Sequence, residues 1–220
     1  MQKKILILIS LLLGCNANEN EKYNLMPSYR MLNFNYSSAF LNYDPLISKR
    51  TPLPKNQFDF NQLMDNANGG DSNSNLLLFK LFYKDSNCNN VDLNNLKPNS
   101  TCLKATQYLT ESIKQNENNS LALYELSQLY YRGVVFEKNK EKAISILDTV
   151  INKGGKDTLL VCDYLVYITL FDGNRKIKDI NKARYYADLG SRHGSEKCQK
   201  YRNDIDEYIN KSQRKINEYN

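Results

Sequence analysis

Hydrophobic and polar residues follow three different patterns along the 220-residue chain. A short and almost continuous apolar run covers residues 5–13. Residues 16–70 are rich in Asn, Ser, Tyr and Pro and show no sustained apolar period. Over much of residues 71–220 apolar residues recur every three or four positions, the period of a helix with one buried face. The pattern predicts an extended, partly ordered tether over residues 16–70 and an all-α domain over residues 71–220.

The tether is not a plain spacer, because it carries several aromatic and apolar residues. Its composition leaves open whether part of it docks on the helical domain. The residues concerned are Phe34, Tyr36, Phe40, Leu41, Phe58 and Phe60.

One helix recurs three times within the domain. Its copies are marked by Lys-Ala pairs at Ala105, Ala143 and Ala183, which are 38 and then 40 residues apart. Each alanine is preceded by a residue that can cap a helix N-terminus, and followed by an apolar residue one turn later and by Asn or Gly where a helix can end. These residues are Thr101, Tyr108 and Asn116 in the first copy, Asn139, Ile146 and Gly154 in the second, and Asp179, Tyr186 and Gly194 in the third.

Another helix precedes this one in each copy, and we call the preceding helix first-type and the helix with the Lys-Ala pair second-type. Ala122, Leu126, Tyr130 and Gly133 superpose, after a shift of 40 residues, on Cys162, Val166, Leu170 and Gly173. Asn75–Tyr83 fits a degenerate first helix, and Lys197–Tyr219 fits a polar capping helix. The predicted copies therefore cover about residues 75–116, 121–154 and 160–194, with a capping helix over 195–219.

The order small-x3-Leu-x3-Tyr-x2-Gly, a short link with Asn or Asp, then Lys-Ala-x2-aromatic and Gly resembles Sel-one-like (Sel1-like) repeats, relatives of tetratricopeptide repeats. The resemblance covers Leu121–Gly194 well and Asn75–Asn116 weakly. It implies an all-α fold, a short α-solenoid of antiparallel helix pairs. Val135 stands where these repeats usually have Gly. A helical hairpin bundle without solenoid geometry is the alternative.

The N-terminus has the layout of a signal peptide, with Lys3 and Lys4 before the apolar run. That run is too short to span a bilayer. Leu12-Leu13-Gly14-Cys15 resembles a lipobox, which implies a mature chain that begins at an acylated, palmitate-bearing Cys15. The next residue, Asn16, is not the Asp that usually marks inner-membrane retention, so we expect an outer-membrane anchor facing the periplasm. An ordinary secretory signal is the alternative.

Charge and composition favour neither nucleic acid nor a metal as partner. The net charge of +6 falls to about +4 without Lys3 and Lys4, and the basic residues form no stripe. The single histidine, His193, and the absence of a closely spaced cysteine pair argue against a zinc site. No cofactor motif is present.

Four cysteines remain after Cys15, and an even number in an exported chain favours disulfides. Cys88 and Cys102 flank a polar loop, and a bridge there is favoured. A bridge between Cys162 and Cys198 is permitted, and the alternative is that Cys162 is a small buried hydrophobe. Cysteine-rich relatives of the resembling family staple the two helices of one repeat, which supports the first pairing.

The sequence predicts no catalytic residues. His193 lies at the end of a predicted helix, where a structural role is favoured. Glu125 and Asp163 lie on helices near basic residues and are interpreted as solvated.

A candidate partner-binding surface comes from the 40-residue superposition of the first-type helices. Within each helix three positions lie at i, i+4 and i+7, on a stripe beside the predicted core stripe. The six residues are Tyr124, Gln128 and Tyr131 in one helix and Tyr164, Ile168 and Phe171 in the other. In the resembling family such helices line a concave surface. The alternative is that these side chains pack between repeats.

The predicted function is a non-enzymatic, lipid-anchored protein that binds a protein partner. The resemblance implies most specifically an immunity protein that neutralises an antibacterial secreted effector such as a phospholipase. An adaptor in envelope assembly or signalling is the alternative, and a weak hydrolase is a third hypothesis.

Overall fold

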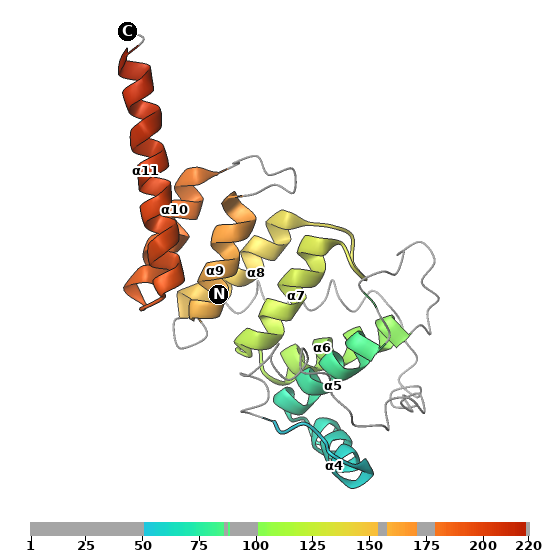
Figure 1. The fold of residues 1–220 in the computed structure, drawn as a ribbon. Coiled ribbons are helices and arrows are strands. Elements are labelled where there is room, and N and C mark those ends of the chain that lie inside the picture. The colour runs from blue at the N-terminus through green and yellow to red at the C-terminus, as the bar shows by residue number, and fades with distance from the viewer. Residues whose placement is uncertain (1–50, 86–87, 89–100, 154–157, 171–178, 219–220) are drawn as a thin grey trace. The chain divides into compact units, whose positions relative to one another are not determined.

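The computed structural model describes residues 51–85, 88, 101–153, 158–170 and 179–218 (Figure 1). All regular elements of these residues, apart from a single 3-10 residue at Cys88, are α-helices, which confirms the expected all-α class. The chain divides into two compact units between Lys138 and Asn139. Unit 1 contains α4 (Gln57–Asn68), α5 (Ser72–Asp85), α6 (Thr101–Gln115) and α7 (Ser120–Arg132). Unit 2 contains α8 (Lys140–Lys153), α9 (Thr158–Leu170), α10 (Ile180–Arg192) and α11 (Glu196–Glu218).

The first helix of the described residues, α4, lies in the segment that we expected to be an extended, partly ordered tether, so the expected extended conformation is wrong for residues 57–68. The side chain of Asn56 accepts a hydrogen bond from the backbone N–H of Asp59 and so caps the helix. Phe60, Leu63 and Ala67 follow at helical spacing and are buried. The ring of Phe60 meets that of Phe82 edge-on at 6.5 Å, so α4 docks on α5. Residues 16–50 lie outside the described residues.

Helices α5 and α6 form an antiparallel pair with an aromatic core. The rings of Phe82 and Tyr108 stack 5.4 Å apart, and Tyr108 occupies the apolar position predicted for the first repeat copy. At the other end of the pair Ser72 and Ser112 each donate a hydroxyl hydrogen bond, 2.7 Å long, to the other's carbonyl oxygen. These reciprocal bonds satisfy the buried polar groups at that end.

Asn119 joins this pair to α7. Its side-chain nitrogen donates to Ser72 Oγ at 2.8 Å. Its side-chain oxygen accepts from the backbone N–H of Ala122 at 3.3 Å and caps α7. One asparagine therefore fixes where α7 begins and holds that end of the helix against α5.

In unit 2 the repeat register predicted for the second-type helices is confirmed. Asn139 and Asp179 accept from the backbone N–H groups of Lys142 and Lys182, at 2.8 and 2.9 Å. Ala143, Ile146, Ala183 and Tyr186 are buried. Tyr186 also donates its hydroxyl to Asp148 at 2.5 Å, which ties α10 to α8.

Helix α10 runs antiparallel to both α9 and α11. The backbone N–H of Asp179, before α10, donates to the carbonyl of Thr169 near the end of α9. Along the other side Arg184 pairs with Asp206 and Arg202 with Asp188. Figure 1 shows α11 continuing past α10, as its 23 residues against 13 require.

Two of the predicted helix stops are glycines in the left-handed region, Gly133 at φ +73° and Gly194 at φ +91°. Asn116 also ends its helix, but without the left-handed conformation that Asn readily adopts at such a position. Its carbonyl accepts from Asn119 N–H at 2.9 Å, so the chain turns tightly there without a left-handed residue. Gly154 and Gly173 lie outside the described residues.

Among the residues that the structure describes, no helix is both long and apolar enough to cross a bilayer.

Candidate functional site

The structure corrects the predicted partner-binding surface at two of its six residues. Gln128 is 5% exposed and Ile168 is fully buried, so neither can meet a partner. Gln128 instead accepts a hydrogen bond from Arg132 at 2.9 Å. Superposing repeats identifies equivalent positions, but the width of the buried stripe depends on how closely neighbouring helices cover each one.

The other four predicted residues have mixed outcomes. Tyr124 and Tyr131 in unit 1 and Tyr164 in unit 2 are half-buried. Phe171 lies outside the described residues. The six residues are divided between the two units, with Tyr124, Gln128 and Tyr131 in unit 1 and the other three in unit 2.

Among the described residues of unit 2, three other tyrosines are about half exposed, and none of them belongs to the predicted partner-binding surface. Tyr167 on α9 is 49% exposed, Tyr185 on α10 is 53% and Tyr208 on α11 is 51%. Leu159, at the start of α9, is 36% exposed. Leu159, Asp163 and Tyr167 are spaced by four residues, so they form one stripe along α9. Because α9 is mostly apolar, its sequence does not distinguish this exposed stripe from the buried side of the helix.

An ion pair joins this stripe to α11. Asp163 Oδ2 lies 3.1 Å from Lys197 Nζ, and the same ammonium lies 5.8 Å from the centre of the Tyr201 ring. Tyr208 follows Lys197 by 11 residues, or about three helical turns, so it lies on the same side of α11. We call Tyr167, Tyr201 and Tyr208, with the Asp163–Lys197 pair between the helices, the tyrosine face.

Unit 1 contains a buried ion pair where the sequence predicted a solvated carboxylate. Glu125 on α7 contacts Lys80 on α5, and each residue is only 8% exposed. Periodicity placed Glu125 near basic residues of its own helix, whereas its partner lies 45 residues away in the chain. The pair joins two first-type helices and is structural.

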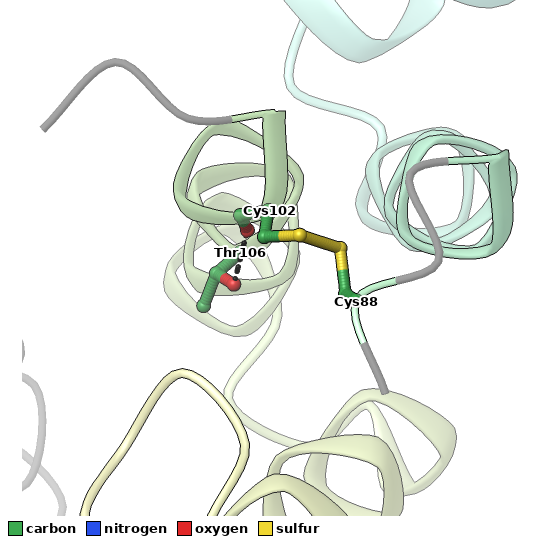
Figure 2. The surroundings of a disulfide bond; sticks show 3 residues. All are labelled: Cys88, Cys102 and Thr106. Atoms are coloured by element: carbon green, nitrogen blue, oxygen red, sulfur yellow. Dashed lines mark hydrogen bonds between the residues drawn. A yellow bond between two sulfur atoms is a disulfide. The ribbon is translucent and has the colours of Figure 1, made fainter. Parts of the chain in front are cut away.

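The structure joins Cys88 to Cys102 by a disulfide, with their Cα atoms 5.6 Å apart (Figure 2). Cys102 lies in the first turn of α6, where its carbonyl accepts a 2.8 Å hydrogen bond from the hydroxyl of Thr106. The bond holds the chain just after α5 against the start of α6. This is the pairing that the polar loop between the two cysteines favours.

Cys162 and Cys198 are unbonded in this structure, and both are fully buried. Burial is the main cause that raises the pKa of Cys162 to about 11 and that of Cys198 to about 12. The thiol of Cys198 also donates to Asp163 Oδ1 at 3.0 Å, which favours its protonated form. Both groups are thiols at neutral pH, so neither is an activated nucleophile.

His193 is an exposed residue that caps the C-terminal end of α10 through its backbone. Its N–H donates to the carbonyls of Leu189 and Gly190. Within the described ranges, no group of three His, Cys, Asp or Glu side chains could hold a metal ion. Cys15, the predicted lipidation site, lies outside those ranges.

The fold is similar to the crystal structure of a Sel1 repeat protein from Oxalobacter formigenes. The two chains are 19% identical, with a TM-score of 0.48 over 66% of this chain and 98% of that one. Its name is that of the repeat class which the sequence motifs resemble. No family model and no curated protein matches this chain.

Proposed function

We propose that this protein is a non-enzymatic binding protein that captures a protein partner on the tyrosine face of unit 2. The observation that carries the proposal is that Tyr167 and Tyr208 remain half exposed on α9 and α11, which the Asp163–Lys197 pair joins. Scattered exposed apolar residues are normal on any surface, but aromatic rings held on adjoining rigid helices are a typical composition of a binding surface.

Tyrosine suits this role because it buries a large area while losing little side-chain entropy, and its hydroxyl still hydrogen-bonds at the edge of an interface. The helices beneath the face are fixed by buried side chains, among them Leu165, Val166 and Ile205. A partner would therefore meet a surface that needs little reordering, which lowers the entropic cost of binding.

We further propose that Cys15 carries the lipid and that the chain faces the periplasm from the outer membrane. The support is the lipobox-like Leu12-Leu13-Gly14-Cys15 and the Asn16 that follows it. Metabolic incorporation of a palmitate analogue, lost in Cys15→Ser, is the expected result. Equal labelling of both proteins would contradict lipidation at Cys15.

The most specific form of the proposal is an immunity protein that neutralises a secreted antibacterial effector such as a phospholipase. It rests on the resemblance to Sel-one-like lipoproteins. A membrane-held binder would meet a lipid-degrading enzyme at that enzyme's own substrate.

The test is a pull-down with the full chain and a Tyr167→Ala, Tyr208→Ala variant, using periplasmic extract and the purified products of neighbouring genes. We expect the parent to retain one secreted enzyme and to inhibit it, and the variant to lose at least tenfold in affinity, about 1.4 kcal/mol.

Tyr185→Ala is the matched control, because Tyr185 is equally exposed but lies on α10, where its ring packs edge-on against Tyr186. It should bind like the parent. Equal binding by the parent, the double variant and the control would show that the interface does not lie on the tyrosine face. Specific capture of envelope-assembly proteins without any inhibited enzyme would favour an adaptor.

A further inference from the structure

Cys162 and Cys198 meet on either side of Gly190. Cys162 lies in the first half of α9, Cys198 in the first turn of α11, and Gly190 near the end of α10. A Cβ atom on Gly190 would stand 2.9 Å from the Cβ of Cys162 and 2.8 Å from that of Cys198, and would also collide with the Cys198 sulfur. The two cysteines are thus neighbours only because residue 190 has no side chain.

Their separation is close to that of a disulfide. Since both Cβ atoms lie within 2.9 Å of one point, they are less than about 6 Å apart, and a disulfide needs about 3.5–4.5 Å. A shift of about 1–2 Å between α9 and α11 would close any remaining gap. No side chain of α10 blocks it, because the residue between them is glycine.

We propose that Cys162 and Cys198 are an oxidisable pair, which forms a disulfide between α9 and α11 when the protein meets an external disulfide such as oxidised glutathione. One cysteine, as its thiolate, attacks a sulfur of the external disulfide and releases the first external thiol. The second cysteine then attacks the mixed disulfide and releases the other. The two protein thiols lose two electrons and two protons, and the external disulfide gains them as two thiols.

The carboxylate of Asp163 has hydrogen-bonding or ionic partners in both the thiol state and the disulfide state of the pair. In the thiol state its Oδ1 accepts from the sulfur of Cys198 at 3.0 Å. When that sulfur turns to Cys162, Asp163 still has Lys197 Nζ at 3.1 Å and the hydroxyl of Ser195 at 3.3 Å. The Asp163 carboxylate is therefore not left unpaired, so forming the disulfide does not incur the free-energy cost of an unsatisfied hydrogen-bond acceptor.

Access to the buried sulfurs comes from the start of α11. Ser195 accepts from the backbone N–H of Cys198 at 3.1 Å, which places Cys198 within the capped first turn. Helix ends open locally at a small fraction of the cost of global unfolding, so this turn can expose Cys198 while the domain stays folded. The pair joins the helices of the tyrosine face, but the inference stands whether or not that face binds a partner.

The test is peptide mapping of the native full chain, first reduced and then exposed to oxidised glutathione without denaturant. Trypsin leaves Cys88 and Cys102 in one peptide, residues 85–104, because Pro98 blocks cleavage after Lys97. Cys162 and Cys198 fall in separate peptides, residues 157–175 and 198–200. We expect these two peptides to appear linked after oxidation and separate after renewed reduction.

Gly190→Ala is the informative variant, because its methyl group would press the two cysteines apart. It should give several times less of the linked peptide, whereas Ser191→Ala on the same helix should give as much as the wild type. The inference is overturned if both thiols remain open to alkylation after oxidation, or if the bond forms only in denaturant. The wild-type measurement alone decides if Gly190→Ala does not fold.

Discussion

At the scale of single residues, Val135 has an unfavourable backbone conformation for its residue type. Its φ is +65°, a left-handed conformation that a β-branched residue rarely adopts. The link on either side explains why it persists, since Gly133 also has a positive φ and Phe136 stacks on Tyr130 at 4.7 Å. The repeats that the sequence resembles usually have Gly here, so the fold keeps a turn that its residue does not favour.

Replacing Val135 by glycine should therefore stabilise the protein. The left-handed conformation costs a non-glycine residue about 1–2 kcal/mol, and glycine's extra entropy in the unfolded chain offsets about half of the gain. We expect Val135→Gly to raise the free energy of unfolding in urea by about 0.5–1 kcal/mol.

Val134→Gly is the control. Val134 is buried at 7% exposure, so its removal should instead lower the free energy of unfolding, by about 2 kcal/mol. If Val135→Gly is as destabilising as Val134→Gly, the turn is not strained and this account of the link is wrong.

At the scale of helices, the contacts between first-type helices depend on polar groups as well as on apolar packing. The Lys80–Glu125 pair lies in the contact between α5 and α7, where both side chains are about nine-tenths buried. A buried pair is stable only while both charges are present, because either one alone keeps its desolvation cost.

Glu125→Leu should lower the free energy of unfolding by about 3 kcal/mol, since it removes the carboxylate that the buried ammonium contacts. Adding Lys80→Met should recover most of that loss, because two apolar side chains of similar size can fill the same space. Urea unfolding of the two single variants and the double variant measures the coupling. Additive losses, without recovery in the double variant, would mean that the two charges do not interact.

Helix α4 shows what sequence periodicity can miss at this scale. Asn56 as a cap and Phe60, Leu63 and Ala67 at helical spacing are all present in the sequence. Their signal is weak because the helix is mostly Asn, Asp and Gln, and because the surrounding segment resembles a linker. Packing of Phe60 on Phe82 stabilises a helix whose composition alone does not predict it.

At the scale of the whole molecule, unit 2 buries several groups that stay protonated in the folded chain. The pKa of Cys162 is about 11 and that of Cys198 about 12, against an ordinary value of 9.0, and burial also raises the pKa of Tyr186 above its usual 10.0. All three are neutral when protonated, so folding favours the protonated form.

Unit 2 should therefore lose stability in alkali under reducing conditions. The thiols contribute fully to the free energy of unfolding below about pH 9, where both the folded and the unfolded chain keep them protonated. This contribution falls at higher pH, because the unfolded chain then begins to release the protons. Each thiol should lower the free energy of unfolding by up to about 1.4 kcal/mol per pH unit, until the pH reaches the folded pKa values of about 11 and 12.

Urea unfolding of the reduced protein between about pH 7 and pH 10.5 measures this slope. The Cys162→Ala, Cys198→Ala variant should show a shallower slope, with Tyr186 as its main remaining cause. Identical slopes for the variant and the wild type would mean that folding does not raise the pKa of the two thiols.

The sequence by itself determined the helical class, the repeat register and most helix ends, because these depend on neighbours within one or two turns. Asn139, Asp179, Gly133 and Gly194 act as the local rules predict. The tertiary structure alone decided which surfaces stay open and which polar groups are buried. Gln128, Ile168 and Glu125 are all buried, and the ionic partner of Glu125 is Lys80, which lies 45 residues away in the chain. Exposure is set by contacts between distant segments, and no periodicity within one helix contains that information.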